Sequence, residues 1–107
     1  MFGNFFKPTP SLSAQDAEKR LQEPNPPLVV DVREAGEHAD GHIPGCVLMP
    51  LGTVPQRMGE LPRDREILVV CRSGARSAMA TKAMRDAGLE ANNMAGGMLA
   101  WRGPTER

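Results

Sequence analysis

The sequence predicts an α/β domain built on a parallel sheet. Its strongest signals are short apolar, β-branched runs, namely LVVDV (residues 28–32), CVLM (46–49) and EILVVC (66–71). They lack the alternation of a half-exposed strand, which is typical of strands buried on both faces of a parallel sheet. Segments with helical spacing and turn residues separate them, and strands that alternate with helices favour an α/β architecture.

The size and composition of the chain fit one globular domain. It has 107 residues, of which 40% are hydrophobic and 24% charged, and thirteen basic residues balance thirteen acidic ones. Because there is no net charge and little aromatic surface, we expect no nucleic-acid partner and no membrane partner. Two cysteines make no disulfide framework, and the first residues lack a signal-peptide pattern, so we expect a cytoplasmic protein.

The first half of the chain begins with an expected N-terminal arm, residues 1–10, followed by the domain, residues 11–107. Phe2, Phe5 and Phe6 in the arm are expected to pack onto the domain. Ser13 and Asp16 resemble a capping box that opens a helix near residues 14–22, which EPNPP ends. The strand at 28–32 follows, then a short helix at 34–39 and the turn GHIPG.

The second half continues with the strand at 46–49, one or two helical turns in TVPQRMGEL, and the strand at 66–71. In the helix expected over residues 75–87, Met79, Ala83 and Ala87 recur at i+4 spacing with Ala80 and Met84 beside them. Together they predict an apolar face, and Gly88 is the cap. LEANNM is a weaker strand, and GGMLAWRG turns into a last short helix.

Cys71 stands where a predicted buried strand gives way to a helix. Ligands of open α/β sheets bind beyond the carboxyl ends of the strands. A glycine-containing loop entering a helix directs several backbone N–H groups toward one point and makes an anion cradle. Helix N-termini and nearby arginines lower the pKa of a cysteine, and the thiolate is the nucleophile. A free cysteine can also be a small buried filler, but Gly74, Arg72 and Arg76 favour the reactive interpretation.

Four stretches resemble the single-domain rhodanese family, whose fold is that of a thiosulfate sulfurtransferase. They are VVDVRE, GEHADGHIPGC, VVCRSGARS and MAGGMLAW, which occur in the family's order and span roughly residues 28–103. The resemblance implies a five-stranded parallel sheet with helices on both faces. It also implies an enzyme in which Cys71 accepts a sulfane sulfur as a persulfide and passes it to a thiophilic acceptor, with no cofactor and no metal ion.

The resemblance also implies roles for the residues around Cys71. The backbone N–H groups of the loop are expected to cradle the persulfide, and two of the loop's arginines are placed to attract the sulfonate of a donor such as thiosulfate. The loop residues are Arg72, Ser73, Gly74, Ala75, Arg76 and Ser77. Asp31 and Arg33, at the end of a neighbouring strand, are expected to form a structural ion pair that supports the loop.

The chain departs from the family pattern at two positions. Cys46 stands where alanine or serine is usual and is expected to be a small filler rather than a resolving thiol, although a disulfide with Cys71 stays open. His38 stands where an aromatic residue is common, and it is expected to contribute packing. His42 belongs to the turn, and an ionised thiol needs no base.

Three alternatives to a small-molecule sulfurtransferase stay open. A persulfide relay to a protein acceptor would have the same sequence, and an interaction module could keep the fold. A cysteine-dependent phosphatase carries Cys-x5-Arg, whereas here Arg76 is the fifth residue after Cys71 and Ser77 the sixth. The shorter loop favours a single added sulfur over a phosphoryl group.

Overall fold

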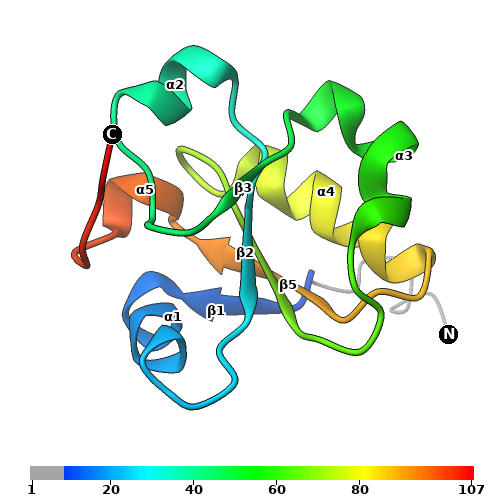
Figure 1. The fold of residues 1–107 in the computed structure, drawn as a ribbon, viewed down its shortest axis with the longest axis horizontal. Helices are drawn as coiled ribbons and strands as arrows, with labels where there is room; N and C mark the ends of the chain where they lie inside the picture. The colour runs from blue at the N-terminus through cyan, green and yellow to red at the C-terminus, as the bar shows by residue number, and fades with distance from the viewer. Residues whose placement is uncertain (1–8) are drawn as a thin grey trace, which may run out of the picture.

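A computed structural model describes residues 9–107, which fold around one five-stranded sheet (Figure 1). The strands are β1 (Ser11–Ser13), β2 (Leu28–Asp31), β3 (Val47–Leu48), β4 (Ile67–Val70) and β5 (Ala91–Ala95). They lie in the order β1-β5-β4-β2-β3, and every pairing is parallel. The predicted five-stranded parallel sheet is therefore confirmed.

Within the described residues, four helices connect successive strands, and a fifth follows the last strand. They are α1 (Ala14–Leu21), α2 (Ala35–Ala39), α3 (Val54–Arg57), α4 (Ala75–Asp86) and α5 (Gly97–Ala100), and two 3₁₀ turns, η2 (Leu51–Thr53) and η3 (Met58–Glu60), flank α3. Ser13 caps α1 as predicted, because its side chain accepts a hydrogen bond from the Asp16 N–H at 3.0 Å. The expected N-terminal arm and its phenylalanines lie outside the described residues, except for Thr9 and Pro10.

Two apolar clusters cover the two faces of the sheet. On one face, Val30 and Val69 pack with residues of α3 and α4, such as Val54 and Met84. The other face packs against α1, against Met98 of α5 and against the tryptophan that follows α5. Helices on both faces bury β2 and β4, as their continuous apolar runs predicted.

The predicted apolar face of α4 is confirmed in part, because its members Ala80 and Met84 are buried but Met79 is exposed. Met79 is 65% exposed, whereas the buried positions of this helix are Ser77, Ala80, Thr81 and Met84. Their i, i+3, i+4, i+7 spacing is that of a helix face, but two of the four residues are polar. The helix is thus rotated so that Ser77 faces the end of β4.

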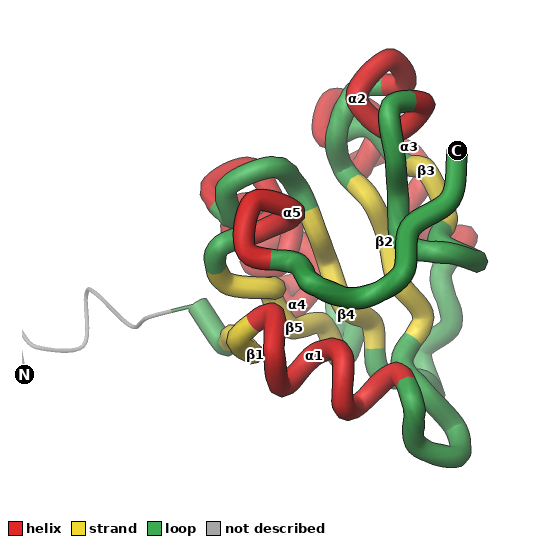
Figure 2. The backbone as a smooth tube through the Cα atoms, turned by 90° about the vertical axis from the view of Figure 1, so that its left-hand side faces the viewer, coloured by secondary structure: helices red, strands yellow, loops and turns green. Residues whose placement is uncertain are grey.

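The strand β1 was not predicted. Ser-Leu-Ser has no β-branched residue, and it forms a strand by pairing with residues 93–95 at the edge of the sheet. Figure 2 shows the chain after α5 crossing to the side of the molecule where α2 lies. There, His42 and Glu106 form an isolated antiparallel bridge.

None of the helices within residues 9–107 is both long and apolar enough to cross a membrane.

Candidate active site

Cys71 lies directly after β4 and four residues before α4, at the carboxyl edge of the sheet. Its exposed fraction is 0%, and the residue belongs to the apolar cluster under α3 and α4. Its sulfur nevertheless faces polar groups. The backbone N–H of Gly74 donates to Cys71 Sγ at 3.0 Å, and Ser77 Oγ lies 3.2 Å from the same sulfur.

These donors decide the ionisation of the thiol. Burial by itself raises the pKa of Cys71, but hydrogen bonds from the Ser77 hydroxyl and from the backbone N–H groups of Ser77, Gly74 and Ser73 lower it further, so that the net pKa is below the ordinary value. Hydrogen bonds to the charged form stabilise the thiolate. Three of the six loop amides that were expected to cradle the sulfur thus act on it.

Glycines allow the loop to close around the sulfur. Gly74 has a φ of 103° and precedes α4, in a left-handed conformation that disfavours other residues. At Gly97, a Cβ atom would lie 2.4 Å from the Arg72 carbonyl oxygen. This close approach lets the N–H groups of Met98 and Leu99 donate to the carbonyls of Cys71 and Arg72, at 2.8 and 3.0 Å. The Gly-Gly segment therefore holds the loop.

Asn93, in β5, contacts both Gly74 and Ser77 of the loop, and it was not predicted as a site residue from the sequence. Ser77 Oγ lies 2.5 Å from Asn93 Oδ1, while Asn93 Nδ2 donates to the Gly74 carbonyl at 3.3 Å. A hydroxyl has one proton to donate. Ser77 therefore shares that proton between Asn93 and Cys71. A polar side chain in a strand between buried residues was the available sequence signal.

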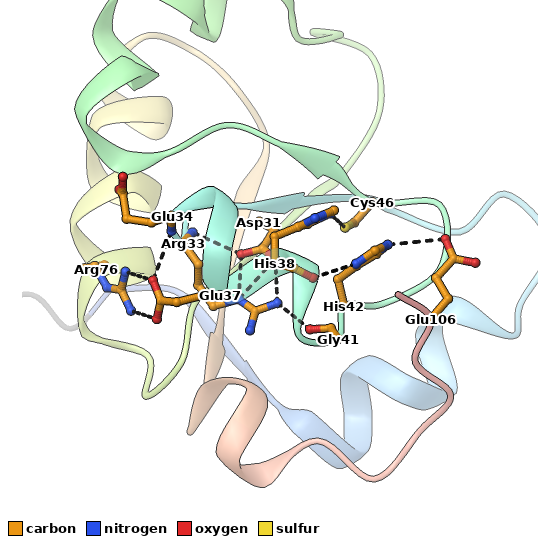
Figure 3. A network of polar contacts seen from close by, with 10 residues as sticks. All are labelled: Asp31, Arg33, Glu34, Glu37, His38, Gly41, His42, Cys46, Arg76 and Glu106. Atoms are coloured by element: carbon orange, nitrogen blue, oxygen red, sulfur yellow. Dashed lines mark hydrogen bonds and ion pairs between the residues drawn. The ribbon is translucent and has the colours of Figure 1, made fainter.

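The two loop arginines differ in their partners. Arg76 makes two hydrogen bonds with the Glu37 carboxylate of α2, at 2.7 and 2.8 Å (Figure 3). The hydrogen bonds from Arg76 lower the pKa of Glu37 to about 2, and the same pair raises the pKa of Arg76. Arg72 is exposed, and its guanidinium has no hydrogen-bond or ion-pair partner within residues 9–107. Of the two, Arg72 is the one whose guanidinium faces solvent without a carboxylate.

Asp31 and Arg33 form the expected ion pair, and both are buried. Arg33 donates to both carboxylate oxygens, with Nη2 at 2.8 Å from Oδ2, and Nη2 also donates to the Gly41 carbonyl at 2.8 Å. The hydrogen bonds of this pair thus hold the turn after α2. Within residues 9–107 the pair has no hydrogen bond to the Cys71 loop, so its support of that loop stays a prediction.

Cys46 differs from Cys71 in its environment. Both are free cysteines. Burial raises the pKa of Cys46 to about 11, so this thiol is protonated at neutral pH. Its sulfur lies 3.5 Å from His38 Nε2, and His38 stacks on His42. Figure 3 draws this group on the right, and Arg76, the one loop residue labelled there, on the left.

A groove of about 350 Å³ lies elsewhere, between α1 and the turn around Pro44, with Pro27 and Trp101 among its lining residues. It includes no residue of the Cys71 loop. Its lining residues include no cysteine or histidine, so the hydrogen-bonded sulfur, and not this groove, marks the candidate active site.

Comparison with known proteins agrees with this geometry. A model of the rhodanese-like domain matches residues 13–104. A sulfurtransferase of Allochromatium vinosum is 36% identical over 91 residues, which are 84% of this chain and 85% of that protein. The Bacillus subtilis protein YtwF is 35% identical over 95 residues, 89% of this chain and 92% of YtwF. The crystal structure of a rhodanese-like domain protein from Staphylococcus aureus superposes with a TM-score of 0.86 at 32% identity, covering 92% and 97% of the two chains.

Proposed function

The chain belongs to the rhodanese-like domain family, and we propose that it is a sulfurtransferase in which Cys71 carries sulfane sulfur from a donor such as thiosulfate to a thiophilic acceptor. The observation that carries the proposal is the set of hydrogen bonds to Cys71 Sγ from Gly74 and Ser77. These bonds favour a thiolate, which is the nucleophilic form of cysteine.

The reaction has two displacement steps. In the first, the Cys71 thiolate attacks the outer sulfur of thiosulfate, the S–S bond of thiosulfate breaks, and sulfite leaves with the electron pair. Cys71 then carries a persulfide with one negative charge on its terminal sulfur. In the second step, an acceptor such as cyanide or a thiolate attacks that terminal sulfur, and the Cys71 thiolate leaves. No net oxidation is required, and the charge balances in each step.

The loop around Cys71 suits both sulfur anions. Backbone N–H groups at the start of α4 keep their direction whatever the charge on sulfur, and the positive end of this 12-residue helix favours an anion near it. We assign these N–H groups, from Arg72 to Ser77, to stabilisation of the persulfide. Because Cys71 is fully buried, a donor reaches it when exposed loop residues such as Arg72 and Ser73 move.

Arg72 is assigned to attract the sulfonate of the donor. Its exposed guanidinium has no carboxylate partner within the described residues, whereas that of Arg76 is engaged by Glu37. We therefore assign Arg76 mainly to hold the loop against α2. Arg72→Ala is expected to raise KM for thiosulfate more than Arg76→Ala, and Arg76→Ala to lower thermal stability more than Arg72→Ala.

The test is sulfur uptake measured by intact mass. Thiosulfate should add about 32 Da, one sulfur atom, to the wild-type chain and to Cys46→Ala, and nothing to Cys71→Ala. Cyanide should then remove the added mass and release thiocyanate. Uptake that persists in Cys71→Ala would overturn the assignment of the carrier. Hydrolysis of an aryl phosphate without sulfur uptake would overturn the proposed reaction.

A further inference from the structure

A second group of reactive side chains lies beside α2. The chain has only two histidines and two cysteines. Both histidines and one cysteine meet here, because His38, His42 and Cys46 each offer a ligand atom within 4.8 Å of the other two. Two of these residues, His38 and Cys46, are the positions at which the sequence departs from the rhodanese pattern. The sulfur-transfer site uses none of the three.

The separations suit a tetrahedral metal site. Bond lengths of about 2.0–2.1 Å to nitrogen or oxygen and about 2.3 Å to sulfur place neighbouring ligands of Zn²⁺ about 3.4–3.6 Å apart. Cys46 Sγ lies 3.5 Å from His38 Nε2, and His42 Nε2 lies 3.4 Å from Glu106 Oε2. Two of the separations are thus close to those of a tetrahedral site. Glu106 approaches His42 but is not one of the three residues whose ligand atoms all lie within 4.8 Å of one another, so its carboxylate would move closer on binding.

The orientation of His42 is also that of a metal ligand. Its Nδ1 lies 2.8 Å from the His38 carbonyl oxygen, which can only accept a hydrogen bond, so Nδ1 carries the proton. In the neutral imidazole Nε2 then has the free lone pair, and this nitrogen faces the Glu106 carboxylate (Figure 3). Metal-binding histidines commonly have their second nitrogen anchored in this way.

Backbone hydrogen bonds hold Glu106 in position. The N–H of Glu106 donates to the His42 carbonyl and the N–H of His42 to the Glu106 carbonyl, both at 2.9 Å. The four side chains therefore come from α2, the turn after it, the residue before β3, and the C-terminal segment. Such a site would connect α2 to a segment more than 60 residues away in sequence.

The local charges favour a cation. Neighbouring Asp31 and Arg33 are paired with each other. Glu106 brings one negative charge, and Cys46 brings a second when its thiol loses a proton to the metal. One thiolate, two imidazoles and a carboxylate suit Zn²⁺ and disfavour Mg²⁺ or Ca²⁺, which prefer oxygen ligands.

We propose that His38, His42, Cys46 and Glu106 bind one Zn²⁺ ion. This departs from our sequence-based expectation of no metal. The two imidazoles are stacked with their centroids 3.6 Å apart and their planes at 8°. Parallel rings cannot both aim in-plane lone pairs at one ion, so binding tilts one ring. With Glu106 as the fourth ligand, all four coordination positions would be filled by side chains, as in a structural zinc site.

The first test uses Co²⁺ as a spectroscopic probe in the untagged Cys71→Ser chain. Cys46 is then the only thiol, so a thiolate-to-cobalt charge-transfer band in the near ultraviolet reports ligation by Cys46 alone. We expect one equivalent of Co²⁺ to produce the band, together with the visible bands of tetrahedral cobalt, and one equivalent of Zn²⁺ to abolish both. Absence of the band at one equivalent, or its presence in Cys71→Ser/Cys46→Ser, would overturn the proposal.

A second test needs no substitution at the site. The chain has two histidines, so an imidazole NMR spectrum contains two sets of signals. One equivalent of Zn²⁺ should shift both sets and saturate at that stoichiometry, because both rings bind and the stack opens. Shifts of one histidine only, or shifts that grow beyond several equivalents, would overturn the four-ligand site. Glu106→Gln should weaken Zn²⁺ binding about tenfold or more, while Glu60→Gln, an exposed carboxylate elsewhere, should not.

Discussion

Removal of the Ser77 hydroxyl should make Cys71 harder to ionise. Ser77 Oγ lies 3.2 Å from Cys71 Sγ and 2.5 Å from Asn93 Oδ1. A hydrogen bond to a charged group contributes about 1.5–3 kcal/mol. Because the proton is shared with Asn93, we take the lower value, which corresponds to about a tenfold change in an equilibrium constant. Ser77→Ala is therefore expected to raise the pKa of Cys71.

The size of the effect on reactivity follows from two opposing changes. At a pH below the pKa, the fraction of Cys71 that is thiolate is about tenfold lower in Ser77→Ala than in the background protein. The thiolate of the variant is more basic and therefore intrinsically more nucleophilic, which raises its rate constant for alkylation about threefold. Alkylation of Cys71 should thus be about threefold slower in Ser77→Ala below the pKa and about threefold faster at high pH, where both thiols are ionised. The reversal of sign distinguishes a pKa effect from a change in access.

The assay is the rate of iodoacetamide alkylation as a function of pH, with Cys46→Ala as the common background. Ser73→Ala is the matched control. The side chain of Ser73 is exposed, and its contribution to Cys71 comes from the backbone N–H, which alanine keeps. The control should follow the background protein. A Ser77→Ala profile that is unchanged, or shifted to lower pH, would refute the role of this hydroxyl.

Stability must be measured in the same variants. Ser77→Ala leaves the buried Asn93 Oδ1 without its hydroxyl donor, and an unpaired buried acceptor costs about 1–3 kcal/mol. Urea unfolding monitored by circular dichroism should show that loss while the variant stays folded under the assay conditions. Equal stability of the variant and the background would show that the Ser77–Asn93 hydrogen bond is not formed.

Three further predictions concern the supports of the site. Glu37→Gln should lower the free energy of unfolding at neutral pH by about 1 kcal/mol, because its ion pair is partly exposed to solvent. The pKa of Glu37 is lowered from 4.5 to about 2. The difference in the free energy of unfolding between wild type and Glu37→Gln should therefore have its full value above pH 4.5 and should disappear as the pH falls through about 2. Urea titrations at a series of pH values measure this difference. Gly97→Ala should destabilise the protein by about 1–3 kcal/mol or more, because the backbone φ of 59° is left-handed and a methyl group would collide with the carbonyls of the loop. Gly36→Ala is the control: this glycine has open space around it in α2, so the alanine should stabilise the protein by up to about 1 kcal/mol. Equal melting temperatures of the two variants would contradict this prediction. In denaturant unfolding, Met84→Ala should cost about 2–5 kcal/mol and Met79→Ala about 0.5 kcal/mol or less, because Met84 is buried and Met79 is exposed. The reverse order would contradict the observed orientation of α4.

The local sequence was sufficient to predict the strands in which nearly every residue is buried. The apolar runs that became β2 and β4 are buried at nearly every position, so their composition alone predicts central parallel strands. It could not predict β1, which is only three residues long. That strand depends on the edge of β5, a partner about 80 residues away.

Side-chain partners within the candidate site were equally non-local. Arg76 was expected to attract the sulfonate of a donor, and in the structure its guanidinium donates hydrogen bonds to the carboxylate of Glu37, 39 residues earlier in the chain. Asn93 reaches Ser77 because β5 lies beside β4 in the sheet. No spacing rule along one segment predicts such pairs, since the chain positions involved are brought together only when the sheet forms.

The amino-acid sequence alone determined the family, the α/β class and the position of Cys71 between a strand and a helix, because apolar runs and glycine positions act within a few residues. The tertiary structure alone decided that Met79 of α4 is exposed, which arginine has a carboxylate partner, and that His38, His42 and Cys46 meet. These outcomes depend on distances between segments that are far apart in the chain, and only the packing of the sheet and its helices sets those distances.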